Sequence, residues 1–96
     1  MISKYDIIFK MNNKQKKTLD SIFENPIRAD IEWDAVISLL SSLGAEVIYN
    51  KGSRVRFRFN GLTAFLDKPH PRRELKRYQV VAIRDFLNDT GICLPE

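Results

Sequence analysis

The sequence has a single cysteine, a single histidine and no long apolar run, and each scarcity excludes a class of protein. Cys93 alone cannot form an internal disulfide or a thiolate metal cluster, which fits a reducing cytoplasm. His70 has only Asp67 and Glu74 as nearby acids, too few ligands for a zinc site, so we expect no metal and no cofactor. No apolar stretch approaches the roughly 20 residues that cross a bilayer, so we expect no membrane contact.

The length of the chain predicts one domain. The chain has 96 residues, of which 44% are hydrophobic. We therefore expect a single folded domain over residues 1–96, with a thin core. The first ten residues lack the long apolar segment of a secretory signal. We interpret residues 1–11 as an N-terminal extension, with Met11 as an alternative start.

Positive charge is concentrated between Lys51 and Arg77. This stretch holds nine Lys or Arg against two acidic residues, although the net charge of the whole chain is only +4. An anionic partner is therefore expected, with the phosphate of a nucleic acid first and an acidic protein surface second. The residues that we expect to bind RNA are Lys51, Ser53, Arg54, Arg56, Arg58, Lys68, Arg72, Arg73, Lys76 and Arg77.

Apolar spacing predicts two helices in the first half of the chain. A short amphipathic helix over residues 14–24 is indicated by apolar residues at i, i+3 and i+4, and Asn25-Pro26 ends it. The second helix is expected to have Asp30 as its N-cap and Gly44 as its left-handed C-terminal residue.

After the second helix the apolar period falls to two, which is typical of a sheet. We expect strands over residues 45–50, 54–59 and 62–66, joined as an antiparallel meander with a type I′ turn at Asn60-Gly61. The middle strand alternates arginine with apolar residues. Its outer face is therefore either simply solvated or a row of guanidinium groups that donate hydrogen bonds to phosphates.

A final helix is expected over residues 78–88, with a start anywhere between Glu74 and Tyr78 because no usual N-cap residue is present. It should pack on the apolar face of the sheet. The whole pattern predicts an α+β fold of order α-α-β-β-β-α, with the helices on one face.

The stretch from Lys68 to Arg77 contains the parts needed to cleave RNA without a metal. RNA supplies its own nucleophile in the 2′-hydroxyl, so the protein needs a base, positive charge and a proton donor. His70 is the candidate catalytic base, and Arg72, Arg73 or Lys76 would offset charge on the phosphorane. Protonated His70, Lys76 and Tyr78 are candidate proton donors. The alternative is that His70 only orders a turn.

Over residues 31–92 the chain resembles the HicA family of toxins from bacterial toxin-antitoxin pairs. The resemblance is carried by Leu43-Gly44-Ala45, Lys51-Gly52-Ser53, Pro69-His70-Pro71, Glu74-Leu75-Lys76, Phe86-Leu87 and Thr90-Gly91-Ile92. It implies a fold similar to a double-stranded-RNA-binding domain, mRNA interferase activity, and a HicB-like antitoxin that covers the basic face. The helix over residues 14–24 lies outside the resemblance and is an extra N-terminal element.

One position departs from the family pattern. Many members carry a catalytic histidine directly after the Gly-Ser turn, where this chain has Arg54 and Val55. Three interpretations follow: His70 is the base, another group is, or the chain binds RNA without cutting it. The alternative function is thus a non-catalytic RNA-binding or antitoxin-binding module, and a third is a structural protein with a solvated basic face.

Overall fold

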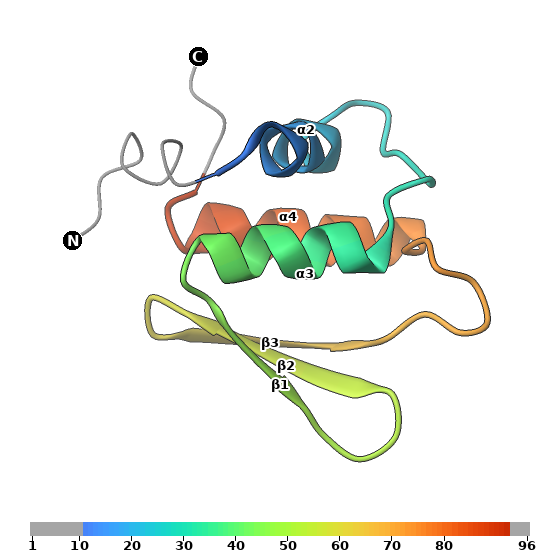
Figure 1. The fold of residues 1–96 in the computed structure, drawn as a ribbon, viewed down its shortest axis with the longest axis vertical. Helices are drawn as coiled ribbons and strands as arrows, with labels where there is room; N and C mark the ends of the chain where they lie inside the picture. Colours follow the sequence, from blue (N-terminus) through green and yellow to red (C-terminus); the bar gives the residue numbers. More distant parts are fainter. Residues whose placement is uncertain (1–10, 93–96) are drawn as a thin grey trace.

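The computed structural model describes residues 11–92, so the expected extension, apart from Met11, and Cys93 lie outside the described residues. The elements in chain order are α2 (Asn13–Ile22), α3 (Trp33–Ser42), β1 (Glu46–Tyr49), β2 (Arg54–Phe59), β3 (Leu62–Asp67) and α4 (Arg77–Asp89) (Figure 1). The predicted α+β fold and its α-α-β-β-β-α order are confirmed. None of these helices is long and apolar enough to cross a membrane.

The three strands form an antiparallel meander in the order β1-β2-β3, as predicted. Asn60 and Gly61 both have positive φ, at 49° and 79°, which is the backbone that a type I′ turn requires. Along β2, Val55, Phe57 and Phe59 are buried while Arg54 and Arg58 are exposed. The alternation in the sequence therefore separates a core face from an outer face.

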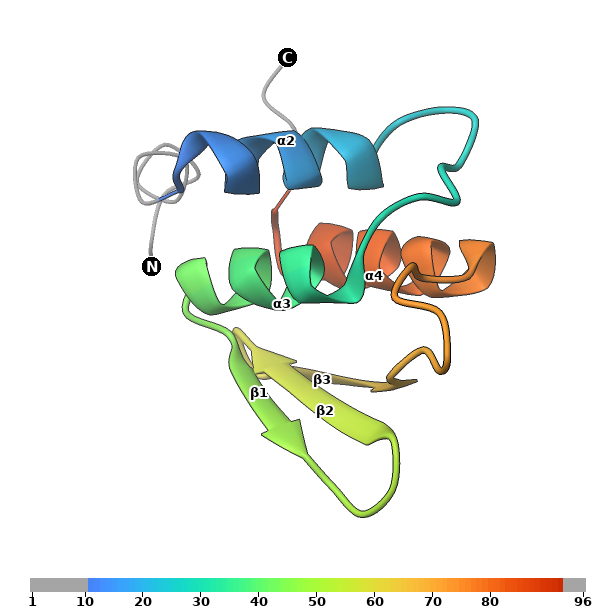
Figure 2. The ribbon, with the colours of Figure 1, turned by 45° about the vertical axis from the view of Figure 1, so that its right-hand side comes forward.

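The molecule has three layers. Helices α3 and α4 lie on one face of the sheet, and α2 lies on the far side of that pair (Figures 1 and 2). The ring centroids of Trp33 on α3 and Phe57 on β2 are 5.8 Å apart, so the two largest fully buried side chains join helix to sheet. Met11 is also buried and belongs to the core.

The helix boundaries differ from the predicted ones mainly at the start of α3. Asn12 caps α2 by accepting a 2.8 Å hydrogen bond from the Gln15 amide. The expected cap of α3, Asp30, is wrong: the N-cap is Glu32, whose side chain makes no capping bond. Asp30 instead accepts two hydrogen bonds from Arg28, at 2.6 and 2.8 Å. Glu32 is held extended by a bridge to Glu74, which delays the first helical turn.

One arginine holds the extra N-terminal helix on the rest of the fold. Arg84 of α4 donates from Nε to the carbonyl of Ile22 at 2.8 Å and from a terminal nitrogen to that of Glu24 at 2.6 Å. Its guanidinium also lies 5.8 Å from the ring centroid of Phe23. Because the last carbonyls of a helix have no partner within it, a cation from α4 acts as the C-terminal cap of α2.

We expect the substitution Arg84→Leu to lower the free energy of unfolding by about 1–3 kcal/mol, because it removes a charged hydrogen bond to the part-buried carbonyl of Ile22 and a second one to the exposed carbonyl of Glu24. Urea denaturation followed by circular dichroism measures the change. Arg72→Leu, at an exposed loop position, is the control and should change the free energy by less than about 0.5 kcal/mol. Equal losses of unfolding free energy in the two variants would show that the hydrogen bonds of Arg84 do not hold α2 on the fold.

Candidate nucleic-acid interface

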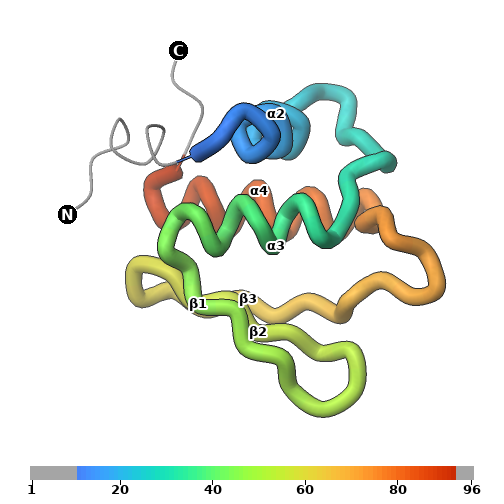
Figure 3. Tube along the Cα trace, in the orientation of Figure 1, coloured from blue at the N-terminus to red at the C-terminus, as the bar shows by residue number. Residues whose placement is uncertain are grey.

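The loop between β3 and α4, residues 68–76 and here called the basic loop, is tied to the start of α3. The amide of Trp33 donates to the carbonyl of Arg73 at 2.8 Å, and the amide of Leu75 donates to that of Ile31 at 2.8 Å. In Figure 3 the loop leaves the sheet and returns beside the first turn of α3. These bonds fix the path of a segment that has no regular secondary structure.

Gln79 closes the basic loop at both ends. Its side chain is almost fully buried, with 2% exposed. The amide nitrogen donates to the carbonyl of Asp67 at 2.7 Å, and the amide oxygen accepts from the backbone N–H of Lys76 at 2.9 Å. One side chain therefore joins the residue before the loop to its last residue, and it satisfies the backbone N–H of Lys76, the N-cap residue of α4.

A cleft of about 410 Å³ lies between the basic loop and the start of α3. The loop side is lined by Lys68, Pro69, His70, Pro71, Arg72 and Arg73, and the helix side by Glu32, Trp33 and Asp34. The histidine thus shares a concave surface with three cations and two carboxylates. Positive charge can bind a phosphate here, and a carboxylate can orient an imidazole N–H.

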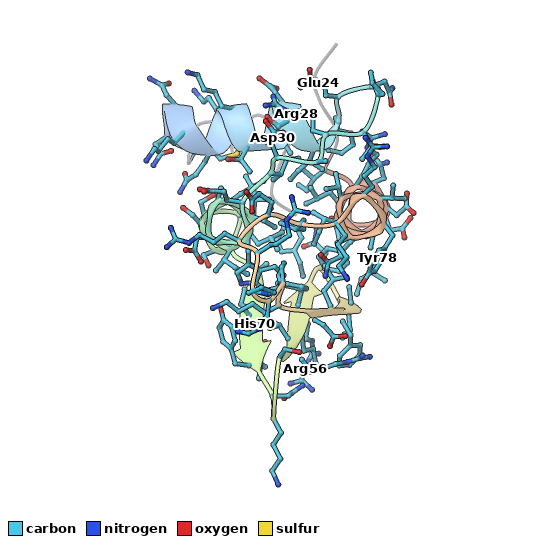
Figure 4. All side chains as sticks on the ribbon, turned by 90° about the vertical axis from the view of Figure 1, so that its right-hand side faces the viewer. Glu24, Arg28, Asp30, Arg56, His70 and Tyr78 are labelled. Atoms are coloured by element: carbon cyan, nitrogen blue, oxygen red, sulfur yellow. The ribbon has the colours of Figure 1, made fainter. Side chains whose placement is uncertain are left out.

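His70 is exposed, and within residues 11–92 no hydrogen bond involves its side chain. Lys76 is the N-cap of α4 and does not line the cleft, and Arg77 begins the helix on the exposed side. Tyr78 belongs to α4 and is 62% exposed, whereas His70 lies below α3 (Figure 4). Of the three candidate proton donors, protonated His70 is therefore the one inside the cleft.

The arginine row on β2 lies on the outer face of the sheet, but its charges are partly occupied. Arg54 lies 5.2 Å from the ring centroid of Phe65 and 3.9 Å from a carboxylate oxygen of Asp67. Arg58 faces Glu46 across the strand pair. The row is thus less like a simple phosphate track than the sequence indicates.

The hairpin turn between β1 and β2 meets the basic loop. The amide of Lys68 donates to the carbonyl of Ser53 at 2.7 Å. Lys51 and Ser53 are exposed on this turn, and Arg54 follows directly. Apart from Lys76 and Arg77, which lie at the start of α4, the predicted RNA-binding residues form one region that runs from the cleft, across the Lys68–Ser53 contact, to the outer face of the sheet.

A larger hollow of about 560 Å³ lies between α2 and α3, but it holds none of the predicted site residues. Its one arginine is already paired, because Arg28 forms ion pairs with Asp30 and with Glu24. The hydrogen bond from Arg28 lowers the pKa of Asp30, and both carboxylates raise that of Arg28. We therefore place the site at the basic loop. Within the described ranges no three His, Cys, Asp or Glu side chains cluster as a metal site would require.

The cleft wall on α3 is the part of the site that the sequence did not indicate. Glu32 and Asp34 are separated from His70 by more than 30 positions, and only pairing of their segment with the loop brings them near it. The one signal in the sequence is alternation: Ile31-Glu32-Trp33 and Glu74-Leu75-Lys76 each place apolar and polar residues in turn. Such short alternation is too common to identify a pair.

Comparison with known proteins gives one match. A protein-family model described as HicA toxin of bacterial toxin-antitoxin matches residues 33–92. The match covers the sheet, α4 and the cleft apart from Glu32, and it leaves out α2. No curated protein and no solved structure gives a significant match.

We expect Gln79→Leu to loosen the basic loop while keeping the volume of the side chain. Loss of both hydrogen bonds should lower the free energy of unfolding by about 1–3 kcal/mol and speed hydrogen exchange at the Lys76 amide. Gln79→Glu is the comparison variant: it destabilises the fold as well, because it buries a carboxylate opposite the Asp67 carbonyl, but it keeps an acceptor for the Lys76 amide and should slow exchange there relative to the leucine variant. Unchanged hydrogen exchange at the Lys76 amide in the leucine variant would show that the two hydrogen bonds of Gln79 do not hold the loop.

Proposed function

Because the chain belongs to the HicA family of toxins from bacterial toxin-antitoxin pairs, we propose that it is a metal-independent mRNA endonuclease of the cytoplasm, inhibited by a HicB-like antitoxin. The observation that carries the proposal is the cleft in which His70, the only histidine, lies with Lys68, Arg72 and Arg73. The base and the positive charge that RNA cleavage needs are thus on one surface.

In the proposed mechanism a phosphodiester binds in the cleft with the adjacent 2′-hydroxyl near the imidazole of His70. The imidazole takes the hydroxyl proton as the oxygen attacks phosphorus. Charge that develops on the phosphorane is offset by Arg72 and Arg73, whose planar guanidiniums suit phosphate oxygens. The bond from phosphorus to the 5′-oxygen breaks, and the imidazolium returns the proton to that oxygen. A 2′,3′-cyclic phosphate and a 5′-hydroxyl result.

Charge complementarity supports the same region as the antitoxin-binding surface. An antitoxin that blocks RNA must cover groups that bind phosphate, and an acidic surface does this most directly. Glu32 and Asp34 limit the positive charge of the cleft, so an acidic partner is expected to contact mainly its open loop side, at Arg72 and Arg73.

A second candidate function is a binding module that does not cut RNA. It is favoured by Arg54, which stands where many HicA toxins carry a histidine and is engaged with Phe65 and Asp67. Cleavage assays separate the two candidates.

We expect His70→Ala to abolish cleavage of RNA by the purified protein in the presence of EDTA, with the rate falling about 100-fold or more because the general base is lost. Gel analysis of a labelled RNA measures the rate, and thermal unfolding checks that the variant is folded. His70→Asn is the matched control for shape. Cleavage by the alanine variant at the wild-type rate would remove His70 from the mechanism, and no cleavage by the wild type would favour the binding module.

Charge reversal of the loop should weaken RNA binding. We expect the double substitution Arg72→Glu and Arg73→Glu to reduce the slope of log affinity against log salt concentration by roughly 0.7 for each phosphate contact that is lost. The matched control is Lys16→Glu with Lys17→Glu on the exposed side of α2, which changes the net charge equally. Titration of a fluorescent RNA at several salt concentrations gives both slopes. Equal slopes for the two double variants would mean that the loop makes no specific phosphate contact.

A further inference from the structure

The outer face of the sheet carries an exposed aromatic side chain among arginines. Phe65 on β3 is 47% exposed, and the cross-strand register places it beside Arg56 and, through Arg56, in line with Ile48. All described helices lie on the opposite face (Figures 1 and 2). A large apolar ring that faces solvent on an edge strand of the sheet is not explained by the core.

The polar groups around Phe65 are suited to a ligand that is both flat and anionic. Arg54 lies over the ring at 5.2 Å, so a phenyl ring and a guanidinium form one stacked pair. Arg56 is half-buried, and its Nε is a buried atom without a hydrogen-bond partner among the described residues, so this N–H is not counted as a contact to a ligand. Figure 4 shows Arg56 on the side of the sheet away from the helices. Nucleobases stack on both phenyl and guanidinium planes.

The charge of this face favours base contacts over a run of phosphates. Three arginines, Arg54, Arg56 and Arg58, are opposed by Glu46 and Asp67 on the neighbouring strands. The face therefore has an excess of only one positive charge, whereas affinity for a duplex backbone depends on many cations. Single-strand binding combines positive charge with exposed rings, and each base that stacks on a ring adds to the affinity.

The outer face also joins the proposed cleavage cleft at one end of the sheet. Arg54 is the first residue of β2 and pairs in register with Asp67, the last of β3. The next residue, Lys68, is bonded to Ser53 and lines the cleft with His70. A strand that leaves the cleft past Lys68 therefore arrives at Arg54 and Phe65.

From this arrangement we infer that an unpaired base flanking the cleaved phosphodiester stacks on the Phe65–Arg54 pair. The inference rests on the proposed RNA-binding function. It adds a specificity-determining residue, Phe65, that lies outside the cleft and takes no part in proton transfer. It also predicts that affinity depends on the bases and not on phosphates alone.

The test uses a fluorescent single-stranded oligoadenylate with 2′-O-methyl groups, which cannot supply the nucleophile and is not cut during the titration. A second probe of the same length has abasic sites in place of the bases. We expect Phe65→Ala to weaken binding of the first probe about tenfold and to leave binding of the abasic probe unchanged. Phe65→Tyr should restore binding, and Phe65→Leu, which keeps apolar bulk, should not.

Val81→Ala is the matched control, because Val81 is an apolar residue of α4 that is 38% exposed and lies on neither the cleft nor the outer face. Binding by Phe65→Ala at the wild-type affinity, while the reversal of Arg72 and Arg73 weakens binding, overturns the stacking inference and leaves the proposed function intact. An equal loss with both probes also overturns it. Failure of the wild-type protein to bind either probe overturns both proposals. If Phe65→Ala weakens only the antitoxin complex, the face is a protein interface and the inference is wrong.

Discussion

The site depends on a short backbone pairing between residues 31–33 and 73–75. Its two hydrogen bonds attach an irregular loop to the first residues of a helix, and the buried side chains of Trp33 and Leu75 exclude water from around it. A loop of nine residues with several cations would otherwise gain entropy and lower its self-repulsion by spreading into solvent. The pairing makes the cleft a fixed surface, and Gln79 extends the same restraint to the start of α4.

The two faces of the sheet have separate roles that follow from one alternation. Val55 and Phe57 are fully buried against the helices, so the register of β2 is strongly fixed. Once the register is fixed, Arg54, Arg56 and Arg58 must point outward whatever their own interactions contribute. Burial of the inner face thus stabilises the sheet. For this reason the outer face can carry exposed Phe65 and half-buried Arg56 without loss of the fold.

Most of the fold could be predicted from the sequence, because it is written in local periods and turns. The period of α3 and the alternation of β2 mark in the sequence which residues face the core, and the positive φ at Asn60-Gly61 is set by the turn itself. The site could be predicted only in part. His70 and the basic residues of the loop stand together in sequence, but the cleft wall at Glu32 and Asp34 depends on a pairing between distant segments. The predicted N-cap of α3, Asp30, was wrong for the same reason, because the pairing of distant segments sets where the helix begins.

The clamp on α2 has a consequence for how this protein can change over evolutionary time. Arg84 binds carbonyl oxygens of Ile22 and Glu24, which belong to the main chain and are present whatever residue occupies those positions. Residues on the exposed side of α2 can therefore be substituted while the helix stays bound to α4, provided that its few core contacts remain. Related chains that keep this helix should be recognisable by an arginine in the last helix and not by any shared motif in the first.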